Sequence, residues 1–139
     1  MKILNRILTI IAIAALSACT NTYDTTTARN LSEKVSAGTE LTQTDYSEMI
    51  EQYGVALEYL VAATDSVMLE HDPQTRAVLG RELRTQPKYR EMQRVWSDFG
   101  SVLFQARAHG LLDSDNINAY MELTPYSDRY GRNMASLRP

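Results

Sequence analysis

The sequence predicts an all-α protein whose body is a small bundle of three to four helices. Through the middle of the chain, apolar residues recur at steps of three and four, which is the spacing of one face of a helix. No segment alternates apolar and polar residues over enough positions to predict a strand, and prolines and glycines separate the helical stretches. We therefore expect helices that pack on one another around a shared hydrophobic core.

The strongest helical pattern covers residues 42–71. Thr42 or Thr44 can cap its start, and Asp45 suits the positive end of the helix dipole. The His71-Asp72-Pro73 segment ends the pattern, because a proline disfavours helix at the residue before it. A stripe of this kind needs partner helices to cover it. Its members are Tyr46, Met49, Ile50, Tyr53, Leu57, Leu60, Val61, Thr64, Val67 and Met68.

Further helices complete the predicted bundle. Pro87 breaks the pattern between the second and third helices, and Gly110 suits the left-handed position that follows a helix. Pro125 ends the fourth helix, and the tail after it is expected to form at most a short helix packed on the bundle. The predicted helices cover residues 73–84, 88–109 and 113–124, the bundle domain covers 42–124, and the tail covers 125–139.

The N-terminus has the layout of a secretory signal peptide over residues 1–18: a basic start, then about a dozen mostly apolar residues. This run is shorter than the roughly 20 residues that a membrane-spanning helix needs. The segment Leu16-Ser17-Ala18-Cys19 resembles the lipobox of bacterial prolipoproteins at every position. The resemblance covers residues 1–19 and implies cleavage between Ala18 and Cys19, with an N-acyl diglyceride anchor on Cys19. The alternative is an ordinary signal peptide that leaves Cys19 as a free thiol.

The resemblance also implies a location. An Asp after the lipidated cysteine retains such proteins in the inner membrane, so Thr20 favours the outer membrane. Residues 19–41 are rich in threonine and lack apolar periodicity, which predicts a flexible tether. Two tripeptides resemble an O-glycosylation pattern of some Bacteroidota and would modify Thr25 and Ser66, with a plain linker and a plain helix as the alternative.

Composition limits the chemistry. Cys19 is the only cysteine, so the fold has no disulfide and no Cys/His metal cluster. The formal charge of −3 becomes −5 without Lys2 and Arg6, which argues against nucleic acid, or anionic lipid, as the main partner. The Asp113–Asn118 segment departs from a calcium loop at its fifth and sixth positions, and no Gly-x-Ser-x-Gly motif is present. We therefore expect no enzyme activity, and no metal or cofactor beyond the lipid.

Charge is distributed unevenly along the chain. Eight acidic residues and no basic one lie between Glu40 and Asp72, whereas six basic residues oppose two acidic ones between Arg76 and Arg94. Either the acidic first helix pairs with the basic helices, or the basic residues face an anionic partner such as peptidoglycan, lipid headgroups or an acidic protein. The candidate binding residues are Arg76, Arg81, Arg84, Lys88 and Arg90, together with a Tyr/Arg group of the kind common in interfaces, Tyr126, Arg129, Tyr130 and Arg132.

The sequence thus predicts a lipid-anchored envelope protein whose helical body binds another protein or an envelope polymer, as an accessory subunit, inhibitor or scaffold. The alternative is a small-ligand binder with a pocket near Trp96, between the first and third helices.

Overall fold

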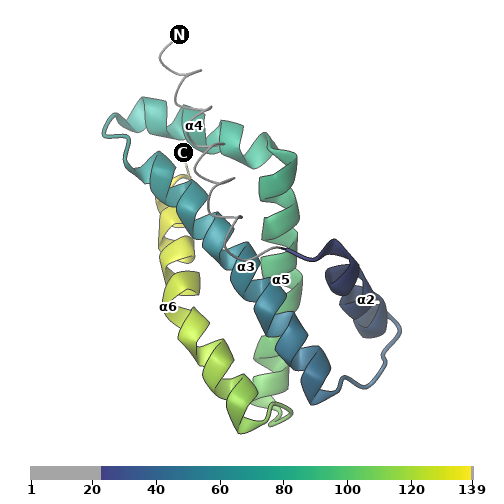
Figure 1. The fold of residues 1–139 in the computed structure, drawn as a ribbon. Coiled ribbons are helices and arrows are strands. Elements are labelled where there is room, and N and C mark those ends of the chain that lie inside the picture. The colour runs from purple at the N-terminus through teal and green to yellow at the C-terminus, as the bar shows by residue number, and fades with distance from the viewer. Residues whose placement is uncertain (1–22, 139) are drawn as a thin grey trace.

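The computed structural model describes residues 23–138, and within them the chain forms five helices and no strand (Figure 1). The all-α class is confirmed, with one helix more than the three or four expected. The predicted signal peptide and Cys19 lie outside the described residues. No helix in this part of the chain is long and apolar enough to cross a membrane. The helices are α2 (Thr25–Ser36), α3 (Gln43–Met68), α4 (Pro73–Thr85), α5 (Pro87–Ala108) and α6 (Ser114–Ser136).

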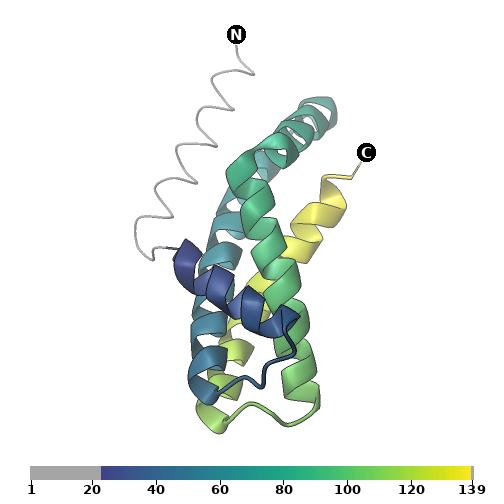
Figure 2. The ribbon, with the colours of Figure 1, turned by 90° about the vertical axis from the view of Figure 1, so that its right-hand side faces the viewer.

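Helix α3 is the centre of the bundle, because each of the other four helices contacts it. Its start is fixed by a capping box: the Thr42 hydroxyl accepts from the Asp45 N–H, and the Asp45 carboxylate accepts from the Thr42 N–H. Burial in α3 extends beyond the predicted stripe to Gln52, Val55, Ala56, Tyr59 and Ala63, while its exposed face carries Ser47, Glu48, Glu51 and Glu58. The sequence pattern therefore predicted fewer buried residues in α3 than the structure contains. Figure 2 shows α2 on one side of the longer helices.

The two ends of the bundle differ in construction. At one end, called here the α4 end, α4 crosses from α3 to α5 and Gly80 packs against Leu137 near the end of α6 (Figure 1). At the other, called the loop end, α3 begins and the α5–α6 loop turns back. The Gln43 side chain joins these segments: it donates to the Leu111 carbonyl at 2.7 Å and accepts from the Asp113 N–H at 3.0 Å.

The prediction of a flexible tether over residues 19–41 is wrong for the segment that forms α2. Asp24 caps this helix by accepting from the N–H groups of Thr26 and Thr27. Only Ala28 and Leu31 are buried in it, so its own apolar pattern is weak. Packing on α3 stabilises the helix, since short helices depend on tertiary contacts more than on propensity.

The predicted boundary at Pro125 is also wrong, because α6 continues through this proline to Ser136. The missing N–H removes one helical hydrogen bond, to the carbonyl of Met121. Both residues are exposed, so water can satisfy that carbonyl. Beyond the proline, Tyr130 and Leu137 are buried in the core, and their burial favours a continuous helix over a loose tail.

Candidate functional site

The predicted basic residues gather around the α4 end but have different roles. The Arg76 guanidinium donates twice to the Glu70 carbonyl, at 2.9 and 2.7 Å, and so closes the C-terminal end of α3. Arg76 is therefore a structural residue in this fold. Arg81 and Arg90 are exposed, and Arg84 is half-buried.

Lys88 connects this end of the bundle with the start of α2. Its ammonium lies 5.0 Å from the centre of the Tyr23 ring, within the range of a cation–π interaction, and 3.8 Å from a Glu91 carboxylate oxygen. Tyr23 is half-buried, and its burial raises the pKa of the phenol, with the Glu91 charge adding to the effect. The first described residue of the chain thus lies beside the first turn of α5.

The acidic residues of α3 do not neutralise the basic helices by direct pairing. Within residues 23–138, Asp45 pairs with Lys34 of α2 at 2.6 Å and Asp65 pairs with Arg129 of α6 at 2.9 Å. Neither pair joins α3 to α4 or α5, as the intramolecular explanation required. Arg94 is exposed like Arg90. Arg81, Arg84, Arg90 and Arg94 form no ion pair within residues 23–138, and these four arginines together with Lys88 are called here the basic surface.

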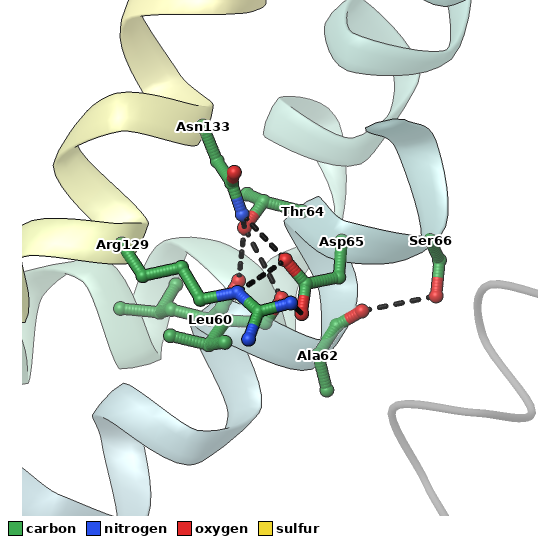
Figure 3. A network of polar contacts seen from close by, with 8 residues as sticks. Leu60, Ala62, Thr64, Asp65, Ser66, Arg129 and Asn133 are labelled. Atoms are coloured by element: carbon green, nitrogen blue, oxygen red, sulfur yellow. Dashed lines mark hydrogen bonds and ion pairs between the residues drawn. The ribbon is translucent and has the colours of Figure 1, made fainter. Parts of the chain in front are cut away.

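The predicted Tyr/Arg group on α6 is not a shared surface. Tyr130 is only 1% exposed, so it belongs to the core. Arg129 binds Asp65 through two nitrogens, Nε at 3.1 Å and Nη2 at 2.9 Å from separate carboxylate oxygens (Figure 3). Tyr126 and Arg132 remain exposed. The prediction of a binding role for Tyr130 is therefore wrong, and Arg129 serves first to join α6 to α3.

The same polar network contains buried groups that could suggest a site. Asn133 donates to the Thr64 hydroxyl at 3.0 Å and to Asp65 at 2.8 Å, and the Thr64 hydroxyl donates to the Leu60 carbonyl (Figure 3). The neighbouring Ser66 hydroxyl donates to the Ala62 carbonyl at 2.9 Å. Each of these contacts stays within α3 or joins it to α6. The network is best explained as a polar lock between the two helices.

Trp96 is less buried than a central core residue. Its ring meets the Tyr130 ring edge-on at 4.9 Å, and its indole N–H donates to the Ser127 hydroxyl at 3.3 Å. Two open hollows lie instead between α2 and α3, with volumes of about 600 and 460 Å³, and Trp96 lines neither. Both hollows are polar. Their linings share Thr27 and Glu48.

The hollows carry several carboxylates, but the described residues contain no group of three His, Cys, Asp or Glu side chains that could hold a metal ion. Asp24 and Asp45, which line them, already cap helices. Hydrogen bonds from Thr27 lower the pKa of the Asp24 carboxyl, and the Lys34 ammonium lowers that of Asp45. Both are therefore charged structural groups.

The sequence reasoning missed an apolar surface at the loop end. Phe104 is 61% exposed and Leu111 is 52% exposed, and both lie where α5 ends. Val35 at the end of α2 and Met121 in the second turn of α6 are also exposed. These four residues are called here the apolar surface. Phe104 could have been identified because it lies off the buried stripe formed by Phe99, Leu103 and Ala106.

Comparison of the chain with models of known protein families, with curated proteins and with solved structures finds no match.

Proposed function

We propose that this chain is a lipid-anchored protein of the bacterial outer membrane, whose helical body binds another protein through the apolar surface. The lipobox segment supports the anchor. The carrying observation for the binding role is that four of six large exposed apolar side chains in residues 23–138 lie at the loop end. Exposed apolar side chains gathered in one place mark interaction sites, whereas scattered ones are ordinary.

The ends of several elements meet there and hold this surface in a fixed shape. Lys34 near the end of α2 pairs with Asp45 near the start of α3. Gln43 connects the start of α3 with the α5–α6 loop. The surface is therefore presented by a rigid scaffold, so a partner would bind without ordering a loop first.

The anchor is tested by metabolic labelling with an alkyne fatty acid. The natural chain should incorporate the label and appear as a shortened, lipidated form. Cys19→Ser removes the only thiol that can accept the diacylglycerol, so it should abolish labelling and leave the precursor uncut. Normal processing of Cys19→Ser would contradict the lipobox assignment.

The binding role is tested with a photoreactive amino acid in place of Phe104, in the lipid-anchored protein in its native membrane. We expect a discrete cross-linked species that disappears when Leu111→Glu is added. The matched control places the same group at Leu69, which is 75% exposed at the α4 end. Equal cross-linking from positions 104 and 69, or a product unaffected by Leu111→Glu, would refute the proposed surface.

The alternative function is binding of a small ligand. The hollows between α2 and α3 favour this more than the neighbourhood of Trp96, whose indole N–H and ring already have partners. Their polar lining, with Glu48 shared by both, would suit a cationic or hydrogen-bonding ligand better than an apolar one. A native-membrane extract that raises the melting temperature of the natural chain, but not of Glu48→Gln, would support this alternative.

A further inference from the structure

We infer that the basic surface rests on an anionic lipid surface, namely the headgroups of the membrane that holds the Cys19 anchor, and that the loop end consequently points away from that membrane. The inference rests on the proposed lipid anchor but concerns a different part of the molecule from the proposed protein-binding surface. Its occupant is a lipid headgroup bearing a phosphate or another negative group.

The position of Tyr23 carries the first step. Tyr23 is the fourth residue after Cys19, and a fully extended chain covers at most about 3.6 Å per residue, so the anchor lies within roughly 14 Å of Tyr23. The Tyr23 ring lies beneath the Lys88 ammonium at the start of α5. Because α2 is folded against α3, no long tether holds the bundle away from the bilayer.

Charge decides which surface near the anchor faces the headgroups. The hollow beside Tyr23 is lined by Asp24, Glu48 and Glu51 and would be repelled by negative lipids. The Tyr23 ring also contacts Lys88 at the start of α5, and the arginines of the basic surface, which lie on α4 and in the first half of α5, make no ion pair within residues 23–138. Basic residues close to an anionic membrane are attracted within a Debye length, about 10 Å at 0.1 M salt.

The acidic groups near the basic surface keep their negative charge but are outnumbered, because only Glu82 and Glu91 lie among the six basic residues between Arg76 and Arg94. Asp72 accepts from the N–H and the hydroxyl of Thr75 at the start of α4, and Glu91 faces Lys88. Glu82 is exposed and offsets one arginine. The loop end carries Asp113, which caps α6, and Asp115 in its first turn, against Arg107 in the last turn of α5. An anionic surface would therefore attract one end of the bundle and repel the other.

The length of α5 sets the distance between the basic surface and the apolar surface. Phe104 lies sixteen residues beyond Lys88 on the same helix, which corresponds to about 24 Å at 1.5 Å per residue. A bundle standing on its basic surface would hold Phe104 and Leu111 in the aqueous space, accessible to a protein partner. A bundle lying on its acidic side would place negative charge against the headgroups.

The test uses the lipid-anchored protein in vesicles of phosphatidylcholine with or without phosphatidylglycerol. Since the lipid occupies Cys19, a cysteine introduced at Thr85 or at Ser114 can be labelled alone with a fluorophore. Lipids with a nitroxide on the headgroup then quench whichever label lies near the bilayer. We expect strong quenching at position 85 only with phosphatidylglycerol, weak quenching at position 114, and release at 1 M salt, where the Debye length is about 3 Å.

Two charge-matched variants on α5 separate local from overall charge. Arg90→Gln should lower the ratio of docked to undocked protein about fivefold, and Arg90→Gln with Arg94→Gln about 30-fold, because each basic residue near such a surface contributes roughly a factor of five. Arg107→Gln removes the same charge from an exposed residue at the far end of the helix, so it should change the ratio less than about twofold.

Each outcome decides the inference. Protein that floats with the vesicles but shows equal quenching in both lipid mixtures keeps its anchor and overturns the lipid-facing role of the basic surface. Equal effects of Arg90→Gln and Arg107→Gln would overturn it as well. So would cosedimentation with purified peptidoglycan through Arg90 and Arg94 without quenching, which would assign the surface to the polymer. Protein that does not float overturns the anchor and the inference together.

Discussion

Removing one hydroxyl from the buried Tyr89–Tyr130 pair should destabilise the bundle, whereas removing both should cost little more than removing one. The two phenol oxygens are 2.8 Å apart, and the side chains are 0% and 1% exposed. Burial raises the pKa of both phenols, which favours the protonated form of the pair. The pair joins α5 to α6.

The neighbours of the pair indicate which hydroxyl donates. The Tyr89 hydroxyl lies 3.0 Å from the Met134 sulfur, and the Gln93 amide lies 3.4 Å from the Tyr130 oxygen. A relay in which Gln93 donates to Tyr130, Tyr130 to Tyr89, and Tyr89 to Met134 gives every hydrogen an acceptor. In Tyr89→Phe the Tyr130 hydroxyl loses its acceptor, and an unsatisfied buried donor costs about 1–3 kcal/mol. In Tyr130→Phe, Tyr89 retains Met134, so the loss should be about 1 kcal/mol.

The double variant leaves two apolar rings in contact, and such paired replacement is nearly neutral relative to a broken pair. We therefore expect a coupling free energy of about 1–2 kcal/mol between the two sites. Urea unfolding followed by the fluorescence of Trp96, the only tryptophan, measures it. Additive losses in the double variant would refute the relay. So would an unchanged stability of Tyr130→Phe, which would show that the Tyr130 hydroxyl forms no stabilising hydrogen bond.

Three further predictions concern the helices that position the two surfaces. Gly131→Ala should raise the free energy of unfolding by about 1 kcal/mol, because nothing lies within 4 Å of the added methyl group on α6; unchanged denaturant midpoints would contradict this. Asp65→Asn should cost about 1 kcal/mol through its partly exposed pair with Arg129, and additive losses in a double-variant cycle with Arg129→Gln would show that the pair does not couple. The pKa of Asp45 is lowered by Lys34, so its stabilising effect is complete above the unfolded value near 3.9 and is lost as the pH falls through the lower folded value. The protection of the α2 amides against hydrogen exchange, measured relative to the intrinsic exchange rate at each pH, should therefore fall in acid, and an equal fall in Asp45→Asn would contradict that cause.

The sequence was sufficient where a helix carries its own boundaries. Thr42 and Pro73 predicted the starts of α3 and α4, and Pro87 predicted the start of α5, because capping side chains and prolines act locally. The sequence pattern was insufficient for helices that form because they pack on other helices. Helix α2 has two buried residues and is held by α3. The second half of α6 continues through Pro125 because Tyr130 has a place in the core.

In the candidate sites, too, some features follow from the local sequence and others depend on packing. The excess of positive charge between Arg76 and Arg94 is visible in the sequence. Its division into Arg76, which closes α3, and the unpaired arginines depends on contacts between elements. The apolar surface was missed because its members belong to different elements, with Val35 on α2, Phe104 on α5 and Met121 on α6, and packing decides which apolar side chains stay exposed.

The folding of α2 has a consequence for how any partner could reach the protein. A flexible segment from Cys19 to residue 41 would let the bundle turn freely, and either end could then face the membrane. With α2 docked, Tyr23 lies beside Lys88 and only three residues separate it from Cys19 in the sequence, so the orientation of the bundle is coupled to the contacts that hold α2. Gln52, which accepts from the Asp24 N–H at 2.8 Å, and Lys34, which binds Asp45, fasten the two ends of that helix. Weakening either contact should therefore reduce the difference in headgroup quenching between positions 85 and 114 without affecting lipidation, because the anchor and the docking of α2 are separate steps.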